Sequence, residues 1–232
     1  MDFENRAHGR IYIGENFWIT ITDTLISTWI IGGLLILLAI VVRLKLKSFK
    51  DVPTGKFQNI VETLVETFEN FAVGILTKKY AYFSGWFFGV FLFVLVSNIS
   101  GIFGLRPPTL DFATVFPLAV TTVLLVQFMG LRHNMKGGAY IKDFFRPFPL
   151  FMPINLMGEV ANSLSLSLRL FGNLLGGTII MSLVFNALPT FFTFAVPGVL
   201  ALYFDIFVGA LHALIFVMLS MFFIMGKAPE EA

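Results

Sequence analysis

One stretch of the chain carries a single charge among apolar and small polar residues: Val160-Ala-Asn-Ser-Leu-Ser-Leu-Ser-Leu-Arg169-Leu-Phe-Gly-Asn173-Leu-Leu-Gly-Gly-Thr178-Ile-Ile-Met-Ser-Leu-Val-Phe185. Its composition is typical of a membrane-embedded helix. A cation near the middle of a bilayer costs about 2.5–3.5 kcal/mol on insertion scales, so it is seldom kept without a function. The alternative is an arginine near a helix end that snorkels to the membrane surface. At least eight uncharged residues flank Arg169 on each side, which favours a functional arginine.

Small polar residues are spaced to share the helical face of Arg169. Asn162 and Ser165 lie seven and four residues before it, and Asn173 and Gly176 lie four and seven residues after it. Those offsets fall on one face of an α-helix. Packing against a neighbouring helix also uses small polar residues and would explain Ser165 and Gly176. It does not explain a fixed charge.

Composition places the whole chain in a membrane. Its 232 residues are 57% hydrophobic and only 13% charged, whereas an average soluble domain carries about 25% charge. Several windows exceed 18 apolar residues, which identifies an integral membrane protein. Cysteine is absent, which excludes disulfides, cysteine-ligated zinc and thiol catalysis. A net charge of +2 gives no indication of nucleic-acid binding.

Motifs for soluble-enzyme chemistry are missing from the sequence. It contains no Walker motif, GxGxxG run or metal-binding cluster. We therefore expect no cofactor and no metal, and we expect nucleotide chemistry to take place on another polypeptide. Residues 1–16 are polar, without an apolar signal-peptide core, so we expect an external N-terminal segment rather than a removable signal.

Three motifs resemble one known family. The segment Pro153-Ile-Asn-Leu-Met-Gly-Glu159-Val-Ala-Asn-Ser-Leu-Ser-Leu-Ser-Leu-Arg169-Leu-Phe-Gly-Asn173 resembles the signature of subunit a of F-type ATP synthases. The runs Phe91-Leu-Phe-Val-Leu-Val-Ser-Asn98-Ile-Ser-Gly-Ile-Phe-Gly104 and Gly209-Ala-Leu-His212-Ala-Leu-Ile-Phe-Val-Met-Leu-Ser220 match as well. The resemblance covers about residue 57 to the C-terminus. It implies a subunit that is not catalytic alone and that belongs to a rotary complex in the cell membrane, most simply a bacterial one.

The hydropathy pattern predicts one all-α membrane domain with about five crossing helices and one amphipathic surface helix. The apolar runs are residues 17–42, 83–103, 113–131, 152–185 and 191–225. Basic clusters at residues 43–50 and 132–146 fall on the same predicted side of the membrane. By the positive-inside rule that side is cytoplasmic, which places the N-terminus outside and the C-terminus in the cytoplasm.

Residues 57–77 differ in kind from the crossing helices. Apolar residues recur at helical spacing, at Ile60, Leu64, Phe68, Phe71 and Ile75, and glutamates occupy the other side, at Glu62, Glu66 and Glu69. Three glutamates disfavour a crossing, so we predict a helix lying along the cytoplasmic surface. Its acidic face favours protein neighbours as well as lipid; the alternative is a surface helix without a partner.

The last two apolar runs are too long for an upright crossing. They cover 34 and 35 residues, or about 51–53 Å of straight helix against a hydrocarbon core of about 30 Å. Either the helices break, for which Pro197-Gly198 is a candidate, or they are steeply tilted. We predict that residues 152–225 form a strongly tilted antiparallel pair joined at 186–190.

The resemblance also implies partners and a role for the arginine. Subunit a of this family lies beside a rotating ring of small hairpin subunits, each with one carboxylate near mid-membrane. The other partners it implies are the lipid bilayer, the membrane subunits of a peripheral stalk and, indirectly, the soluble catalytic head. Two offset half-channels would carry H⁺ or Na⁺ to and from the ring, separated by Arg169. A guanidinium remains charged at physiological pH, as that role requires. Asn173, Ser165 and Asn162 would hydrogen-bond or orient it.

Further residues match the family's ion pathway. Glu159 resembles the acid at the cytoplasmic mouth, although an interfacial glutamate is the alternative. Asp205 occupies the position of the external half-channel group, and His212, seven residues on, is expected on the same helical face. The family more often has glutamine where His212 stands, and that histidine either titrates or is a satisfied structural group. Thr178 departs from the family's usual glutamate or histidine, which leaves one ionisable group where relatives have two.

Three further polar residues lie outside the motifs of the ion pathway. Asp111, in the external turn, either draws cations to an entrance or is a plain loop residue. Asn98 and Gln127 are expected to form interhelical hydrogen bonds.

The alternative to a stator subunit is a self-contained secondary transporter or channel, but no internal repeat is present. A purely structural scaffold leaves Arg169 unexplained.

Overall fold

The computed structural model describes residues 7–12, 18–49, 55–133, 148, 150, 152–187 and 195–227. Five helices are long and apolar enough to cross a membrane: Asp23–Leu46, Lys78–Phe103, Phe112–Met129, Met152–Ala187 and Gly198–Gly226. This confirms the predicted all-α membrane fold with about five crossings. A small β-hairpin at the N-terminal end is an addition that the sequence analysis did not anticipate.

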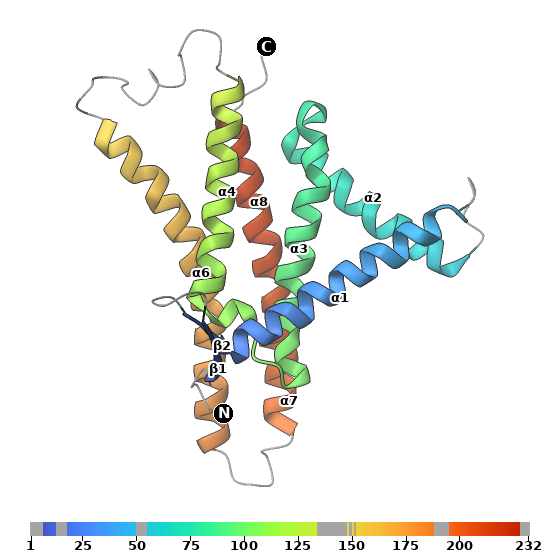
Figure 1. Cartoon of the computed structure of the whole chain (residues 1–232), viewed down its shortest axis with the longest axis vertical. Coiled ribbons are helices and arrows are strands. Elements are labelled where there is room, and N and C mark those ends of the chain that lie inside the picture. The colour runs from blue at the N-terminus through green and yellow to red at the C-terminus, as the bar shows by residue number, and fades with distance from the viewer. Residues whose placement is uncertain are drawn as a thin grey trace.

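The described elements follow one another in this order: β1 (Ala7–Tyr12), β2 (Trp18–Thr22), α1 (Asp23–Leu46), α2 (Lys56–Leu76), η1 (Lys78–Phe83), α3 (Ser84–Ile99), η2 (Ser100–Phe103), η3 (Pro108–Leu110), α4 (Phe112–His133), α6 (Met152–Ala187), α7 (Ala195–Ala201), η5 (Leu202–Val208) and α8 (Gly209–Lys227). Helices α3, α4 and α8 run side by side, and α6 is inclined to them (Figure 1). The β-hairpin and the η2–η3 turn lie at one end of this bundle, and the C-terminal end of α8 lies at the other.

A continuous apolar core joins the helices α2, α3, α4, α6 and α8. Phe87 and Val94 of α3, Ala119 of α4, Leu166 of α6 and Met221 of α8 are among its fully buried members. Alanine and valine are mixed with larger apolar side chains in this core, and the small residues let neighbouring helices approach closely. This core fixes which faces of α6 and α8 remain accessible.

The predicted amphipathic helix is α2, and its two halves have different environments. Phe68 is buried and packs against Phe88 and Phe91 of α3, with ring centroids 5.0 and 5.5 Å away. Ile60 and Leu64, nearer the N-terminal end of α2, are exposed. The helix therefore has protein neighbours within the chain, and it contacts them through its apolar face. Partners for its acidic face remain a prediction. Its position on the cytoplasmic membrane surface remains a prediction.

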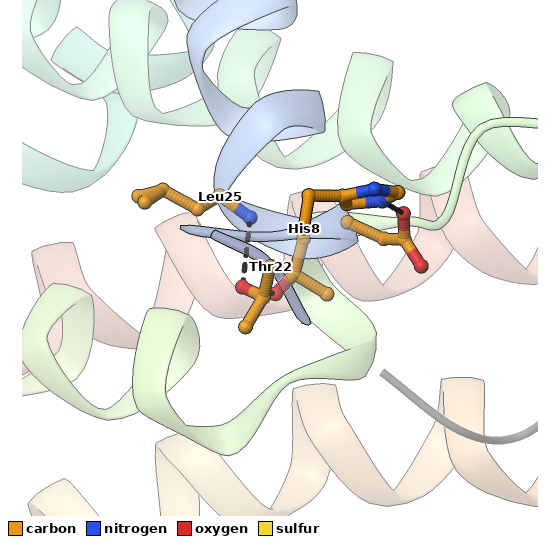
Figure 2. A network of polar contacts seen from close by, with 5 residues as sticks. His8, Thr22 and Leu25 are labelled. Atoms are coloured by element: carbon orange, nitrogen blue, oxygen red, sulfur yellow. Dashed lines mark hydrogen bonds and ion pairs between the residues drawn. The ribbon is translucent and has the colours of Figure 1, made fainter. Parts of the chain in front are cut away.

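The first crossing helix begins later than the apolar run predicted. Residues of β2 form an antiparallel pair with β1, so α1 starts at Asp23 rather than near residue 17. The sequence Trp18-Ile-Thr-Ile-Thr22 is rich in β-branched side chains, which favour a strand over a helix. Figure 2 shows how the hairpin meets the helix: the Leu25 amide donates to Thr22 Oγ1 at 3.4 Å, and His8 Nε2 lies 2.5 Å from Asp23 Oδ1.

The two long C-terminal runs form an antiparallel pair, but they are built differently. Helix α6 is unbroken over 36 residues, which corresponds to about 54 Å. The second run changes from α-helix to the π-helical segment η5 and back to α-helix at Gly209. Pro197 and Gly198 lie inside α7 without ending it, because proline is tolerated in the first turn of a helix. The irregularity therefore lies at η5 and not at the proline where the sequence suggested a break.

Candidate functional site

Arg169 occupies the midpoint of α6. Seventeen residues of this helix precede it and eighteen follow it, so each helix end is about 25–27 Å away along the axis. An arginine side chain is far too short to reach a membrane surface over that distance by lying along the helix. The midpoint position argues against the snorkelling alternative for this residue.

The guanidinium of Arg169 lies on the outward face of α6. Helix α6 buries Ser163, Leu166, Ser167, Leu170 and Leu174 against the rest of the chain, at helical spacing. Arg169 and Ser165 fall on the opposite side and are exposed. Within the described part of the chain, no ion pair or hydrogen bond to the Arg169 side chain is present. A cation at the middle of the helix therefore faces away from the rest of the chain, where a neighbouring molecule can contact it.

The polar stripe predicted around the arginine is present in the structure. Because α6 is a continuous α-helix, Asn162, Ser165 and Asn173 share the side of Arg169, and both asparagines are half-buried. No hydrogen bond joins these side chains to the guanidinium among the described residues. Their orienting role therefore remains a prediction. Glu159 lies in α6 three residues before Asn162, the first residue of this stripe, and its side chain is not among those that the structure describes.

Asp205 lies within η5, where it meets the η2 turn. A Cβ atom added to Gly101 would be 3.4 Å from Asp205 Oδ2 and 3.3 Å from Pro107 Cγ. The carboxyl group is half-buried. It is therefore brought next to a glycine of the turn that follows α3, at the end of the bundle that carries the β-hairpin. Sequence reasoning found Asp205 but not Gly101, because no local signal links residues so far apart in the chain.

The last two helices also meet beside Thr178. Gly177 is buried, and a Cβ atom there would lie 3.6 Å from Phe204 Cβ. Thr178, the next residue along α6, donates its hydroxyl hydrogen to Leu174 O at 2.8 Å. This bond to its own helix satisfies the hydroxyl, as it does for many threonines in membrane helices. Thr178 and Asp205 thus each follow a residue at the contact between α6 and η5.

His212 has a backbone partner in its own helix. Its Nδ1 atom lies 2.9 Å from Val208 O. A carbonyl oxygen only accepts, so this contact assigns the hydrogen to Nδ1 and leaves Nε2 as the second ring nitrogen. The expectation that Asp205 and His212 share one face assumed a regular α-helix. The π-helical segment η5 changes the number of residues per turn between them, so the seven-residue rule does not apply across it.

Asp111 has a defined structural role. Its Oδ1 accepts from the Ala113 amide at 3.0 Å, at the start of α4, and its Oδ2 accepts from Thr24 Oγ1 at 3.0 Å. The residue therefore caps α4 and links it to α1. A role at an ion entrance remains a prediction beside this observation.

The buried amide Asn98 forms the interhelical hydrogen bond that its sequence context predicted. Its Nδ2 donates to Gly209 O of α8 at 2.9 Å, and its Oδ1 accepts from Thr109 Oγ1 at 2.8 Å. Gln127 lies half-buried in α4. The contacts of Asn98 thus form a buried polar cluster where α3 meets the start of α8.

Comparison with known proteins identifies the family to which this arrangement belongs. A family model described as ATP synthase A chain matches residues 25–225. The chain belongs to this family. It is 34% identical to ATP synthase subunit a of Moorella thermoacetica over 208 residues, covering 89% of this chain and 90% of that protein.

Two further relatives show how broad the similarity is. ATP synthase subunit a, sodium ion specific, of Propionigenium modestum is 34% identical over 230 residues, with 90% of this chain and 75% of the relative covered. ATP synthase subunit a of Desulfosudis oleivorans is 32% identical over 241 residues, covering 100% of this chain and 93% of the relative. As a member of the ATP synthase A chain family, the chain is a multi-pass membrane component of an ion-translocating ATP synthase.

Proposed function

We propose that this chain is the stator that passes H⁺ or Na⁺ between two aqueous half-channels and a rotating ring of carboxylate-bearing subunits. The observation that carries the proposal is the position of Arg169: it is at the midpoint of an apolar 36-residue helix, exposed, and without an ion pair among the described residues. A cation at that depth needs an anionic partner. The side chains that the structure describes do not supply one, so we assign the partner to a neighbouring subunit.

The guanidinium acts on the ring carboxylate through its permanent charge. As a protonated or ion-loaded carboxyl group approaches, the nearby cation stabilises the ionised form and lowers the affinity for the bound ion. The same positive charge repels a cation that would otherwise pass directly from one half-channel to the other. Discharging the ring site and preventing a leak therefore follow from one side chain.

The two half-channels are proposed to open at opposite ends of α6. Glu159 lies ten residues before Arg169, about 15 Å along the helix, toward the end of the bundle that holds the C-terminal end of α8. Asp205 lies near the other end, beside Gly101 and the η2 turn. Arg169 falls between them along the axis. We assign Glu159 to the cytoplasmic half-channel and Asp205, with Thr178 and His212 nearby, to the external one.

Lipid and the membrane subunits of the peripheral stalk are proposed to contact helices α1 and α2. Helix α1 exposes a long apolar surface that includes Trp29, Leu34, Ile36, Leu37 and Leu44, and the N-terminal half of α2 exposes Phe57, Ile60 and Leu64. In a bilayer this surface contacts lipid and the membrane subunits of the peripheral stalk. The soluble catalytic head is then reached through that stalk. The protein itself performs no catalysis, and we place it in the cell membrane with the N-terminus outside and the C-terminus in the cytoplasm.

Reconstitution into liposomes tests this function against a self-contained transporter or channel. The complete complex should acidify vesicles, or accumulate ²²Na⁺, when ATP is added, and an Arg169→Ala complex should not. The purified chain alone should show neither solute uptake nor ion conductance. Uptake or conductance by the chain alone would favour the transporter or channel instead.

A further inference from the structure

At the C-terminal end of the π-helical segment η5, side chains as well as backbone amides donate hydrogen bonds to the backbone carbonyl groups. Two consecutive carbonyl groups at this junction accept side-chain hydrogen bonds. Val208 O accepts from His212 of the same helix, and Gly209 O accepts from Asn98 of α3 at 2.9 Å. A π-helical turn bonds each amide five residues back instead of four, so the return to α-helix disturbs the regular pairing at this point. These side-chain donors stabilise one particular register there.

Asn98 is well suited to be such a donor. It is fully buried, and the two ends of its amide are both engaged, with Thr109 Oγ1 donating to its Oδ1 at 2.8 Å. Because Gly209 O only accepts, the amide nitrogen must face α8, and the Thr109 hydroxyl stabilises that orientation. A buried hydrogen bond of this kind is costly to leave unmade.

The approach between α3 and α8 at this point is too close for any other residue. A Cβ atom on Gly209 would lie 2.9 Å from Asn98 Cβ, closer than non-bonded carbon atoms come. Glycine therefore lets the Gly209 carbonyl reach the Asn98 amide. The contact fixes the position of α8 along its axis relative to α3, and also the rotation of α8 about that axis.

The same two stretches of chain that make this contact also position the acid. Gly101 follows Asn98 by three residues, and Asp205 precedes Gly209 by four. The contact between Gly101 and Asp205 is thus the next one along from the contact between Asn98 and Gly209. A shift of η5 by one residue would rotate Asp205 about the helix axis by most of a right angle or more. The carboxyl group would then leave its place beside Gly101.

We propose that Asn98 is a positioning residue that fixes the register of η5 and thereby holds the Asp205 carboxyl group beside Gly101. The inference deepens the proposed function, on which it rests, because Asp205 is the acid assigned to the external half-channel. Thr109 acts with Asn98 by orienting its amide.

Cross-linking measures the position of Asp205 directly, since the chain contains no cysteine. Gly101→Cys with Asp205→Cys places one sulfur next to the other cysteine's Cβ, and Gly177→Cys with Phe204→Cys gives a second pair whose Cβ atoms are 3.6 Å apart. Both pairs should oxidise rapidly in membranes that contain the assembled complex. Adding Asn98→Leu should slow both reactions about fivefold, the change expected from the loss of one buried hydrogen bond.

Matched variants separate positioning from general disruption. Thr109→Val should slow cross-linking in the same direction as Asn98→Leu, and Thr109→Ser should restore the rate because it keeps the hydroxyl. Ser97→Ala is the control: Ser97 is fully buried next to Asn98, and its hydroxyl has no hydrogen-bond partner among the described residues. It should leave both rates unchanged. If Asn98→Leu prevents assembly, the Thr109 pair carries the test.

Failure of the positioning proposal and failure of the proposed function would give different experimental results. Slower cross-linking in Asn98→Leu and Thr109→Val, with normal rates in Thr109→Ser and Ser97→Ala, supports the positioning role. Unchanged rates in Asn98→Leu or Thr109→Val membranes, with the complex assembled, would overturn it. ATP-driven pumping by an Arg169→Ala complex would overturn the ion-translocation proposal while leaving these cross-linking rates as they are.

Discussion

The carboxyl group of Asp205 lies against Gly101, close enough that a Cβ atom added to the glycine would touch it. A Cβ atom on Gly101 would be 3.4 Å from Asp205 Oδ2, the near edge of ordinary van der Waals contact, so a side chain longer than a methyl group would meet the carboxyl group. The relationship joins the turn after α3 to the π-helical part of the last crossing. It identifies a position where side-chain size alone should control access to the acid.

Enlarging residue 101 should therefore reduce ion flux. Gly101→Leu fills the space beside Asp205 and should lower ATP-driven pumping severalfold, because the carboxyl group is displaced or covered. Gly89→Leu is the matched control, since nothing lies within 4 Å of a Cβ atom at that glycine of α3. Proton or ²²Na⁺ uptake into inverted membrane vesicles measures both. Equal pumping by the two variants would contradict a role for the small residue at position 101 beside Asp205.

Removing the charge of Arg169 should abolish ion-coupled ATP synthesis. Arg169→Ala leaves no cation to stabilise the ionised ring carboxylate, and Arg169→Lys should also fail or nearly fail. Lysine is a compact point charge that loses its proton more readily when desolvated, whereas the guanidinium stays charged and planar. ATP synthesis driven by an imposed ion gradient measures the loss. Robust activity in the alanine variant would show that the site has been assigned to the wrong residue.

Neutralising Asp205 should reduce ion flux more than any change at Thr178. Asp205→Asn keeps size and hydrogen bonding but cannot exchange a proton, so flux should fall about 10²-fold, within the usual range for the loss of a proton-transfer group. Thr178→Val should have a much smaller effect, because the hydroxyl is already bonded to Leu174 O within α6. Rates are compared at matched ion gradients. Near-normal flux in the asparagine variant would exclude Asp205 as the main external group.

Replacement of His212 distinguishes a titrating histidine from a structural one. Its Nδ1 contact with Val208 O is a bond that a glutamine amide can also donate. His212→Gln should therefore change flux by less than about twofold, the scale of a substitution that removes no essential interaction. His212→Leu removes the donor and should impair function more. A severe loss in the glutamine variant, across the pH range tested, would instead indicate that His212 carries the ion.

The orientation of the chain is open to labelling from each side of the membrane. Ser48 follows α1 in the first basic loop and is exposed. Ser48→Cys introduces the sole thiol of the chain, which should react with a membrane-impermeant maleimide in inverted vesicles but not in intact cells. Thr20→Cys, in strand β2 at the other end of α1, should give the opposite pattern. Labelling of the residue 48 variant in intact cells would reverse the proposed topology.

The local pattern of side chains determined the class of fold and supplied the candidate residues of the site. Hydropathy sets helix formation in a bilayer residue by residue, because every backbone polar group must be bonded within its own segment. The five crossings and the amphipathic helix α2 could therefore be read from sequence. The misplaced start of α1 has a local cause as well: β-branched residues at 18–22 extend the apolar run but prefer a strand.

Tertiary structure decided what each of these helices faces. The sequence indicated a functional arginine, but only the packing of α4 and α8 on one side of α6 leaves Arg169 exposed on the other. The π-helical register of η5, the hydrogen bond from Asn98 to Gly209 and the place of Asp205 beside Gly101 depend on segments about a hundred residues apart. Such contacts arise from the close packing of whole helices, so neither partner's local sequence specifies them.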